Sequence, residues 1–143
     1  MAIKNRPEFE KFIRRVEKSS DVFRVSSTEK RHSKHFRTAR ENLNHLVDDE
    51  SFLEFGQFAV AAQRTRRDYE ELQDKTNADG IITGFCSVNS QLVGEKHSQA
   101  VAIVYDYSVL AGTQGAFHHL KLDRICDQAK KFELPIIIFT EGG

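Results

Sequence analysis

An unbroken apolar run, PIIIF at residues 135–139, is the feature that most limits how this chain can fold. The run is rich in β-branched residues and lacks polar alternation, which is typical of a strand buried on both faces in a parallel sheet. Such a strand needs a crossover connection and covering elements, so we expect the chain to be the front part of a longer protein. Gly142 and Gly143 follow the strand, where adjacent glycine N–H groups can face a developing negative charge.

The composition limits the class of protein. The 143 residues are enough for one domain of ordinary size, and 21 Lys and Arg balance 21 Asp and Glu, which argues against a nucleic-acid-binding protein. The longest apolar run, residues 100–105, is too short to span a bilayer, and the N-terminus has no apolar signal region. Because Cys86 and Cys126 are isolated, we expect reduced thiols and a cytoplasmic protein.

Apolar spacing and capping patterns predict helices in the first half of the chain. Residues 7–18 place apolar side chains on one helical face. A second helix is predicted to begin after Thr38, where Glu41 completes a capping box. By contrast, residues 19–33 are polar and predicted to be irregular, and residues 64–74 are predicted to be a charged surface excursion.

The second half of the chain has the pattern of an α/β fold. Thr113 is predicted to cap a helix over residues 116–131, whose apolar face packs on a sheet. His118 and His119, at the start of that helix, are interpreted as a polar flank rather than a catalytic base. A turn is expected at residues 89–90. The predicted strands are residues 52–55, 81–88, 99–105 and 135–139.

Four further segments resemble one known family in their order and approximate spacing. They read TARENL, SFLEFG, DGIITG and DYSVLAGTQG, at residues 38–43, 51–56, 79–84 and 106–115. Together with the final strand and its glycine pair, they are similar to the N-terminal part of the carboxyltransferase (β) subunit of biotin-dependent acyl-CoA carboxylases, in the crotonase-like superfamily. The resemblance implies an α/β fold with an N-terminal helical segment, residues 1–50. An incomplete N-terminal crotonase-like carboxyltransferase domain would follow, residues 51–143.

The resemblance also implies an activity, a site and partners. That family moves a carboxyl group from carboxybiotin to the α-carbon of an acyl-CoA. Biotin is carried on a partner protein or domain, and the subunits work with biotin carboxylase and biotin carboxyl carrier components as homo-oligomers. Gly142 and Gly143 match the family's oxyanion-hole pair and are the predicted catalytic residues. The predicted substrate-binding residues are Ala111, Gly112, Thr113 and Gly115.

Departures from the family pattern leave a second function open. The Asp-Ser pair before the glycines is Thr140-Glu141 in this chain, and Ala111 stands where the family has a glycine. The connection between the second and third strands is also longer, which places residues 93–98 in a predicted loop insertion. The alternative is a non-catalytic crotonase-like protein that binds acyl-CoA or serves as a subunit scaffold.

Two polar features remain. The basic stretch over residues 24–40 is either a solvated surface or the source of one or two side chains that bind coenzyme A phosphates. His32 and His35 have a spacing that allows metal ligation, but no set of cysteines or carboxylates accompanies them, so we predict no metal site.

Overall fold

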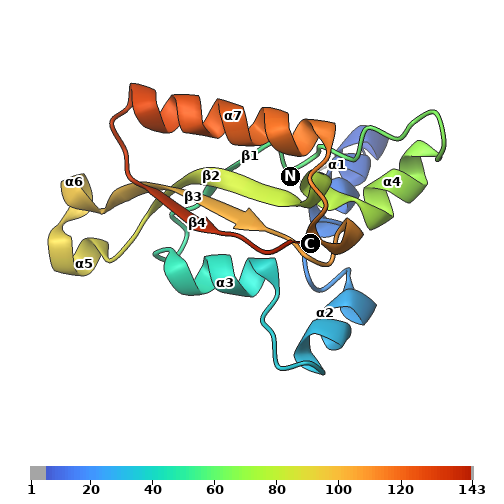
Figure 1. Cartoon of the computed structure of the whole chain (residues 1–143), viewed down its shortest axis with the longest axis horizontal. Coiled ribbons are helices and arrows are strands. Elements are labelled where there is room, and N and C mark those ends of the chain that lie inside the picture. Colours follow the sequence, from blue (N-terminus) through green and yellow to red (C-terminus); the bar gives the residue numbers. More distant parts are fainter. Residues whose placement is uncertain (1–5, 143) are drawn as a thin grey trace.

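A computed structural model of the chain describes residues 6–142. The four strands form one sheet in the order β1-β2-β3-β4, with α7 against one face and α3 against the other (Figure 1). Within the described residues, no helix is long and apolar enough to cross a membrane. The strands are β1 (Leu53–Phe55), β2 (Ile81–Ser87), β3 (Gln99–Tyr105) and β4 (Ile136–Phe139). The helices and 3-10 turns are α1 (Pro7–Glu17), α2 (Val25–His32), α3 (Ala39–Leu46), α4 (Tyr69–Lys75), η1 (Asn77–Gly80), α5 (Ser90–Val93), α6 (Glu95–Ser98), η2 (Leu110–Gly112) and α7 (Ala116–Lys131).

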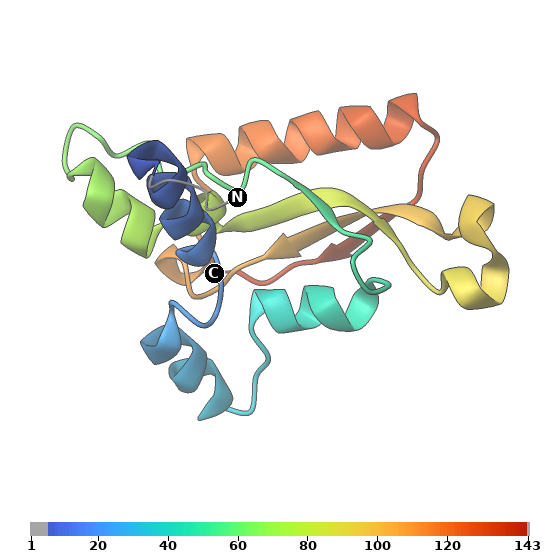
Figure 2. The same cartoon turned by 180° about the vertical axis from the view of Figure 1, so that it is seen from behind.

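The sheet is mixed. Strand β2 pairs antiparallel with both β1 and β3, whereas β3 and β4 pair in parallel, with Ile103 opposite Ile138. Helix α7 is the crossover between the two parallel strands, as the sequence predicted. This connection returns β4 to the side of β3, so the segments that follow these two strands lie at the same edge of the sheet (Figures 1 and 2).

The core lies on both faces of β3. Every residue of this strand except Gln99 is buried. One cluster packs beneath α7 and contains Ile81, Val101, Ile103, Tyr105, Ile125 and Ala129. The other packs against α3 and contains Ala39, Leu43, Ile82, Cys86, Ala100, Ala102 and Val104. Alternate residues of β3 therefore enter opposite layers, which makes it the central strand of this part of the fold.

The predicted N-terminus of α3 is confirmed in detail. The backbone N–H of Glu41 donates to Thr38 Oγ1 at 3.0 Å, and the Thr38 N–H donates to Glu41 Oε2 at 2.8 Å. The strands β1, β2 and β3 and the helices α1 and α7 also agree with the sequence prediction within about two residues. The division of the chain at residue 50 stays a prediction, although α3, which precedes it, packs directly on the sheet.

The structure corrects the expectation of irregular chain over residues 19–33. That stretch contains α2, in which no residue is buried. Because the helix lacks an apolar stripe, hydrophobic spacing could not reveal it. Ion pairs attach its two ends to distant segments instead: Arg24 binds Asp106, and Arg31 binds Glu141.

Three other local predictions were wrong or incomplete. The charged stretch over residues 64–74 includes all of α4 except Lys75, and Leu72 of this helix is fully buried against Val60 and Ala61. The predicted insertion at residues 93–98 forms parts of α5 and α6, at the end of the molecule opposite α4 (Figures 1 and 2). The N-cap of α7 is Gly115 rather than Thr113.

Strand β4 is not buried on both faces, contrary to expectation. It is an edge strand, and Ile136, Ile138 and Phe139 are 42%, 46% and 38% exposed. Only Ile137 packs into the cluster under α3. Its outer edge has no neighbouring strand within residues 6–142, so an apolar strand is left available for pairing.

We expect the isolated chain to self-associate at micromolar concentration. An exposed apolar edge strand is a template for pairing with another copy, and the zero net charge provides little repulsion. Sedimentation should show species larger than the 16.4 kDa monomer. Ile138→Lys should reduce this association, whereas Leu92→Lys, at an exposed apolar position in α5 outside the sheet, should not. A stable monomer would contradict this prediction.

Candidate functional site

The loop after β3 carries the predicted substrate-binding turn. In η2, Leu110, Ala111 and Gly112 have positive φ values of 49°, 54° and 76°. The left-handed region costs a residue with a side chain about 1–2 kcal/mol relative to its ordinary backbone conformations. Ala111, which stands where the family has a glycine, therefore adopts a strained conformation. The surrounding structure, rather than local preference, holds this turn in place.

Gly112 lies directly against the segment that follows β4. A Cβ atom added at Gly112 would lie 2.6 Å from the Glu141 carbonyl oxygen and 2.6 Å from Gly142 Cα. That separation is too short for any side chain to be present without a shift of the backbone. Two glycine segments that are far apart in the sequence therefore meet at this point.

A cavity of about 560 Å³ opens at this contact. Three of the predicted site residues, Gly112, Thr113 and Gly142, line it together. Among the residues that the structure describes, none accepts a hydrogen bond from the Gly142 N–H. The complete lining consists of Tyr105, Gly112, Thr113, Gln114, Thr140, Glu141 and Gly142.

The other predicted site residues lie elsewhere. Ala111 lines a neighbouring cavity of about 550 Å³. Gly115 packs against the Asp79 carboxylate, where an added Cβ would lie 2.8 Å from Oδ2. Gly143, the second predicted catalytic residue, lies outside the described residues.

The basic stretch contributes to the neighbouring cavity through α2 and the residues after it. Lys30, Arg31 and Lys34 line this cavity with Ala111. Lys30 and Lys34 are exposed and form no ion pair with another described residue. Their ammonium groups can therefore bind an anionic ligand that enters beside Ala111.

The arginines of the same stretch have a different role. Each of three arginines forms an ion pair of 2.6 Å with a carboxylate that is distant in the sequence. The stretch is therefore neither wholly a solvated surface nor wholly a ligand site. Three of its four arginines connect elements, and two of its lysines line a cavity. The three pairs are Arg24–Asp106, Arg31–Glu141 and Arg40–Glu54.

Asp79 stabilises the first turn of α7. Its side chain is 1% exposed, and its Oδ2 accepts a hydrogen bond of 2.8 Å from the His118 N–H in the first turn of α7. Asp79 therefore caps α7, because Gly115 at the N-cap has no side chain that could do so. Burial raises the pKa of this carboxyl, although the Phe117 and His118 N–H groups act in the opposite direction.

His118 is a core residue that the sequence analysis misassigned. Its side chain is fully buried, and its ring lies edge-on against Tyr105 with centroids 4.6 Å apart. Burial lowers the pKa of His118. The spacing did contain the signal, because His118 precedes Leu122, Ile125 and Ala129 on the same helical face.

Lys121 is a second polar residue of α7 that turns inward, although its side chain is only partly buried. Its ammonium donates to the Ala78 carbonyl oxygen at 2.7 Å and also to that of Ile81. The absence of a side chain at Gly56 leaves room for its stem, since an added Cβ there would lie 2.8 Å from Lys121 Cε. Burial lowers the pKa of Lys121 to about 8.

The free energy of unfolding should rise with pH between 8 and 9. The pKa of Lys121 falls from 10.5 to about 8 on folding, so in this interval the unfolded chain binds a proton that the folded chain does not. The slope is at most about 1.4 kcal/mol per pH unit. Above pH 9 the Cys86 thiol, whose pKa burial raises to about 11, acts in the opposite direction. Denaturant titrations should show this rise in the unmodified chain and not in Lys121→Met. An equal rise in Lys121→Met would contradict the assignment.

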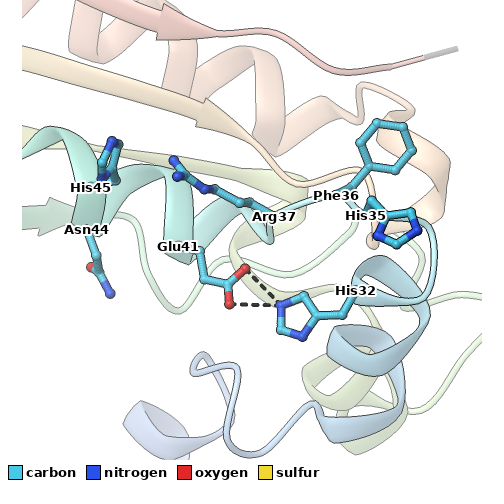
Figure 3. A pocket seen from close by; sticks show the side chains of 7 residues that line it. All are labelled: His32, His35, Phe36, Arg37, Glu41, Asn44 and His45. Atoms are coloured by element: carbon cyan, nitrogen blue, oxygen red, sulfur yellow. Dashed lines mark hydrogen bonds and ion pairs between the residues drawn. The ribbon is translucent and has the colours of Figure 1, made fainter.

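Three histidines, His32, His35 and His45, line a shallow cavity of about 660 Å³. In this cavity His32 Nε2 lies 2.8 Å from Glu41 Oε1 (Figure 3). His45 lies farther along α3, away from this pair (Figure 3). Over residues 6–142, no three His, Cys, Asp or Glu side chains are arranged to hold a metal ion.

Comparison with known proteins identifies relatives of this chain. No protein-family model matches it. It is 32% identical over 116 residues to the acetyl-coenzyme A carboxylase carboxyl transferase subunit beta of Clostridium kluyveri, covering 76% of this chain and 38% of that protein. It is 29% identical over 115 residues to the methylmalonyl-CoA decarboxylase subunit alpha of Veillonella parvula, covering 80% and 21%. The chain thus spans only about a fifth to two fifths of the length of these relatives.

Solved structures agree with the sequence relatives. A single-chain, multi-domain long-chain acyl-CoA carboxylase matches 98% of the chain with a TM-score of 0.94 and 44% identity, although the chain covers 14% of that protein. The transcarboxylase 12S hexamer, with methylmalonyl-CoA bound, matches 94% of the chain with a TM-score of 0.69 and 27% identity, and 25% of that chain is covered. The fold is therefore the crotonase-like α/β fold of carboxyltransferases. Within that class, the chain is a homologue of the carboxyltransferase subunits of acyl-CoA carboxylases.

Proposed function

We propose that this chain forms the acyl-CoA half of the active site in a biotin-dependent acyl-CoA carboxyltransferase. The observation that carries the proposal is the contact between Gly112 and Gly142 at the mouth of a cavity, on a fold shared with carboxyltransferases. Gly142 lines the cavity, and no described residue accepts a hydrogen bond from its N–H. The lysines beside Ala111 suit the phosphates of coenzyme A.

The proposed chemistry begins at the thioester of the acyl-CoA. A proton would leave the α-carbon for the biotin that carboxybiotin releases, which places negative charge on the thioester carbonyl oxygen. Backbone N–H groups fixed in position stabilise that charge better than water does, and the loss of one such donor typically costs about 3 kcal/mol of transition-state stabilisation. The N–H groups of Gly142 and Gly143 would supply these donors. Glycine suits both positions because it allows the ligand to approach the backbone closely.

Biotin and the other components belong to the rest of the proposed enzyme. Carboxybiotin, carried on a partner protein or domain, would supply the carboxyl group, and we assign no residue of this chain to it. The proposed partners are biotin carboxylase and biotin carboxyl carrier components and further copies of the same subunit, in the cytoplasm. The isolated chain should therefore bind acyl-CoA weakly and show no carboxyl transfer.

Gly143→Pro is expected to lower turnover of the complete protein about 100-fold or more, since proline removes one oxyanion-hole donor. Gly143→Ala retains the N–H and should lose far less activity. The measurement is carboxyl transfer from carboxybiotin to acyl-CoA, with thermal unfolding recorded for each variant. Normal turnover in a folded Gly143→Pro protein would contradict the role of this N–H group. Acyl-CoA binding without any transfer by the unmodified protein would instead favour the non-catalytic alternative.

A further inference from the structure

The segment before Gly142 is tied to α2 by a two-pronged ion pair. Arg31 Nη1 donates to Glu141 Oε1 at 2.6 Å, and Arg31 Nη2 donates to Glu141 Oε2 at 2.8 Å. The Arg31 side chain is 12% exposed and that of Glu141 is 37% exposed. This parallel geometry fixes the direction of the carboxylate as well as its distance.

Arg31 is itself a fixed anchor. Its Nε and Nη2 both donate to the Arg37 carbonyl oxygen, at 3.0 and 2.8 Å. The guanidinium also lies over the rings of Phe36 and Tyr107, 5.1 and 5.7 Å from their centroids. Because these contacts do not involve Glu141, they hold the guanidinium in place independently. The ion pair therefore restrains the segment that carries Glu141 relative to a guanidinium that other contacts hold.

Glu141 connects this anchor to the glycine contact. It directly precedes Gly142. Its carbonyl oxygen is one of the two atoms that lie nearest to the position of a Cβ added at Gly112. Its side chain points to α2 while its backbone rests on the turn after β3. Glu141 thus contacts Arg31 through its side chain and Gly112 through its backbone, and it is bonded to Gly142.

We propose that Arg31, acting through Glu141, is a positioning residue that sets the place of the Gly142 N–H relative to Gly112. This inference rests on the proposed function, because the ion pair between Arg31 and Glu141 would hold that N–H where an acyl-CoA thioester could reach it. Glu141 departs from the family pattern at this position. The ion pair between Arg31 and Glu141, called the clamp below, gives a physical reason why a glutamate can stand before the glycines.

The chain contains a matched control for this clamp. Arg40 and Glu54 form a second two-pronged pair, with distances of 2.6 and 2.9 Å and with both side chains less than one fifth exposed. That pair joins α3 to β1 and does not touch Gly112 or Gly142. Its loss should affect stability without moving the glycine segment.

The test is nuclear magnetic resonance of the isotopically labelled chain in an Ile138→Lys background, which should reduce the self-association predicted above. This background chain is the unmodified reference for the variants below. In the unmodified chain we expect cross-relaxation between the α-protons of Gly112 and Gly142, and an ordered Gly142 amide. Arg31→Met and Glu141→Gln should each remove the cross-peak and lower the Gly142 order parameter from about 0.85 to below about 0.6. Arg40→Met and Glu54→Gln should leave both signals unchanged. The exchanged pair, Arg31→Glu with Glu141→Arg, should recover part of the cross-peak.

Three results would overturn the clamp: a disordered Gly142 in the unmodified chain, an unchanged cross-peak in Glu141→Gln, or an equal loss in the Arg40 and Glu54 variants. Titration with acetyl-CoA forms a separate arm, in which the Arg31 and Glu141 variants should bind about tenfold more weakly than the unmodified chain. If the cross-peak behaves as expected but the unmodified chain does not bind acetyl-CoA, the clamp stands and the proposed function fails.

Discussion

Gly112→Ala is expected to weaken the binding of acyl-CoA by about tenfold or more, which corresponds to about 1.4 kcal/mol. The added Cβ would lie 2.6 Å from both the Glu141 carbonyl oxygen and Gly142 Cα. Because both are backbone atoms, no side-chain rotation can relieve the contact. The segment that carries Gly142 must move, and its N–H then leaves the position that the ligand requires. Calorimetric titration with acetyl-CoA measures the loss.

Gly94→Ala is the matched control for this prediction. Gly94 also has a positive φ, 82° against 76° for Gly112, so alanine is strained at both positions. With a ψ of 155°, Gly94 lies in a region that is almost confined to glycine, so the control carries a full backbone penalty of its own. An added Cβ at Gly94 meets no atom within 4 Å, and the residue lies between α5 and α6, at the opposite end of the molecule. Gly94→Ala should bind acetyl-CoA normally. Equal binding by the two variants would place the ligand away from the Gly112 contact.

Asp79→Ala is expected to lower the free energy of unfolding by about 2–4 kcal/mol. The variant removes the cap of α7 and leaves the buried N–H of His118 without its acceptor. Asp79→Asn should be milder, because its amide oxygen can still accept this bond and asparagine tolerates the φ of 49° found here. Denaturant unfolding of both variants measures the difference.

A comparable cost for Asp79→Ala and Asp79→Asn would show that the carboxylate charge, rather than the cap, stabilises the fold. A cost below about 1 kcal/mol for Asp79→Ala would contradict the capping role altogether. Gly115→Ala provides an independent check, since its Cβ would lie 2.8 Å from Asp79 Oδ2 and should disturb the same bond.

The motifs that carry the family resemblance are explained mainly by the construction of the fold. Thr38 and Glu41 cap α3, and Arg40 ties that helix to Glu54. Gly84 allows β1 to close on β2, since an added Cβ would lie 2.4 Å from the Leu53 carbonyl oxygen. These residues cap a helix or hold two elements together. Because the fold requires them, the motifs that contain them indicated the fold before any contact was known.

Regular periodicity predicted the central elements well. Strand β3 and helix α7 agree with their predicted bounds because an unbroken apolar strand and a helical apolar stripe are strong local signals. Helix α2 was missed because arginine ion pairs rather than an apolar face attach it to the fold. Ion pairs between residues so distant in the sequence produce no periodic pattern from which a helix could be predicted.

The candidate site was predicted only in part. The glycines at 112 and 142 were each identifiable, but their contact depends on the parallel pairing of β3 and β4 and on the turn between them. The clamp between Arg31 and Glu141 could not be predicted, because neither residue belongs to a local motif with the other. The capping of α7 by Asp79 could not be predicted for the same reason, although Asp79 belongs to the DGIITG segment that resembles the family.

The most direct test of the acyl-CoA half-site is to titrate the isotopically labelled chain with acetyl-CoA and follow the backbone amide resonances. The account predicts saturable shifts at Gly112, Thr113 and Gly142, with further shifts at Lys30 and Lys34, whereas the amides of α5 and α6 stay unchanged. Free coenzyme A should shift the lysine region but not Gly142, because it lacks the thioester carbonyl. An absence of shifts at millimolar acetyl-CoA, or saturable shifts confined to residues away from Gly112 and Gly142, would contradict the account.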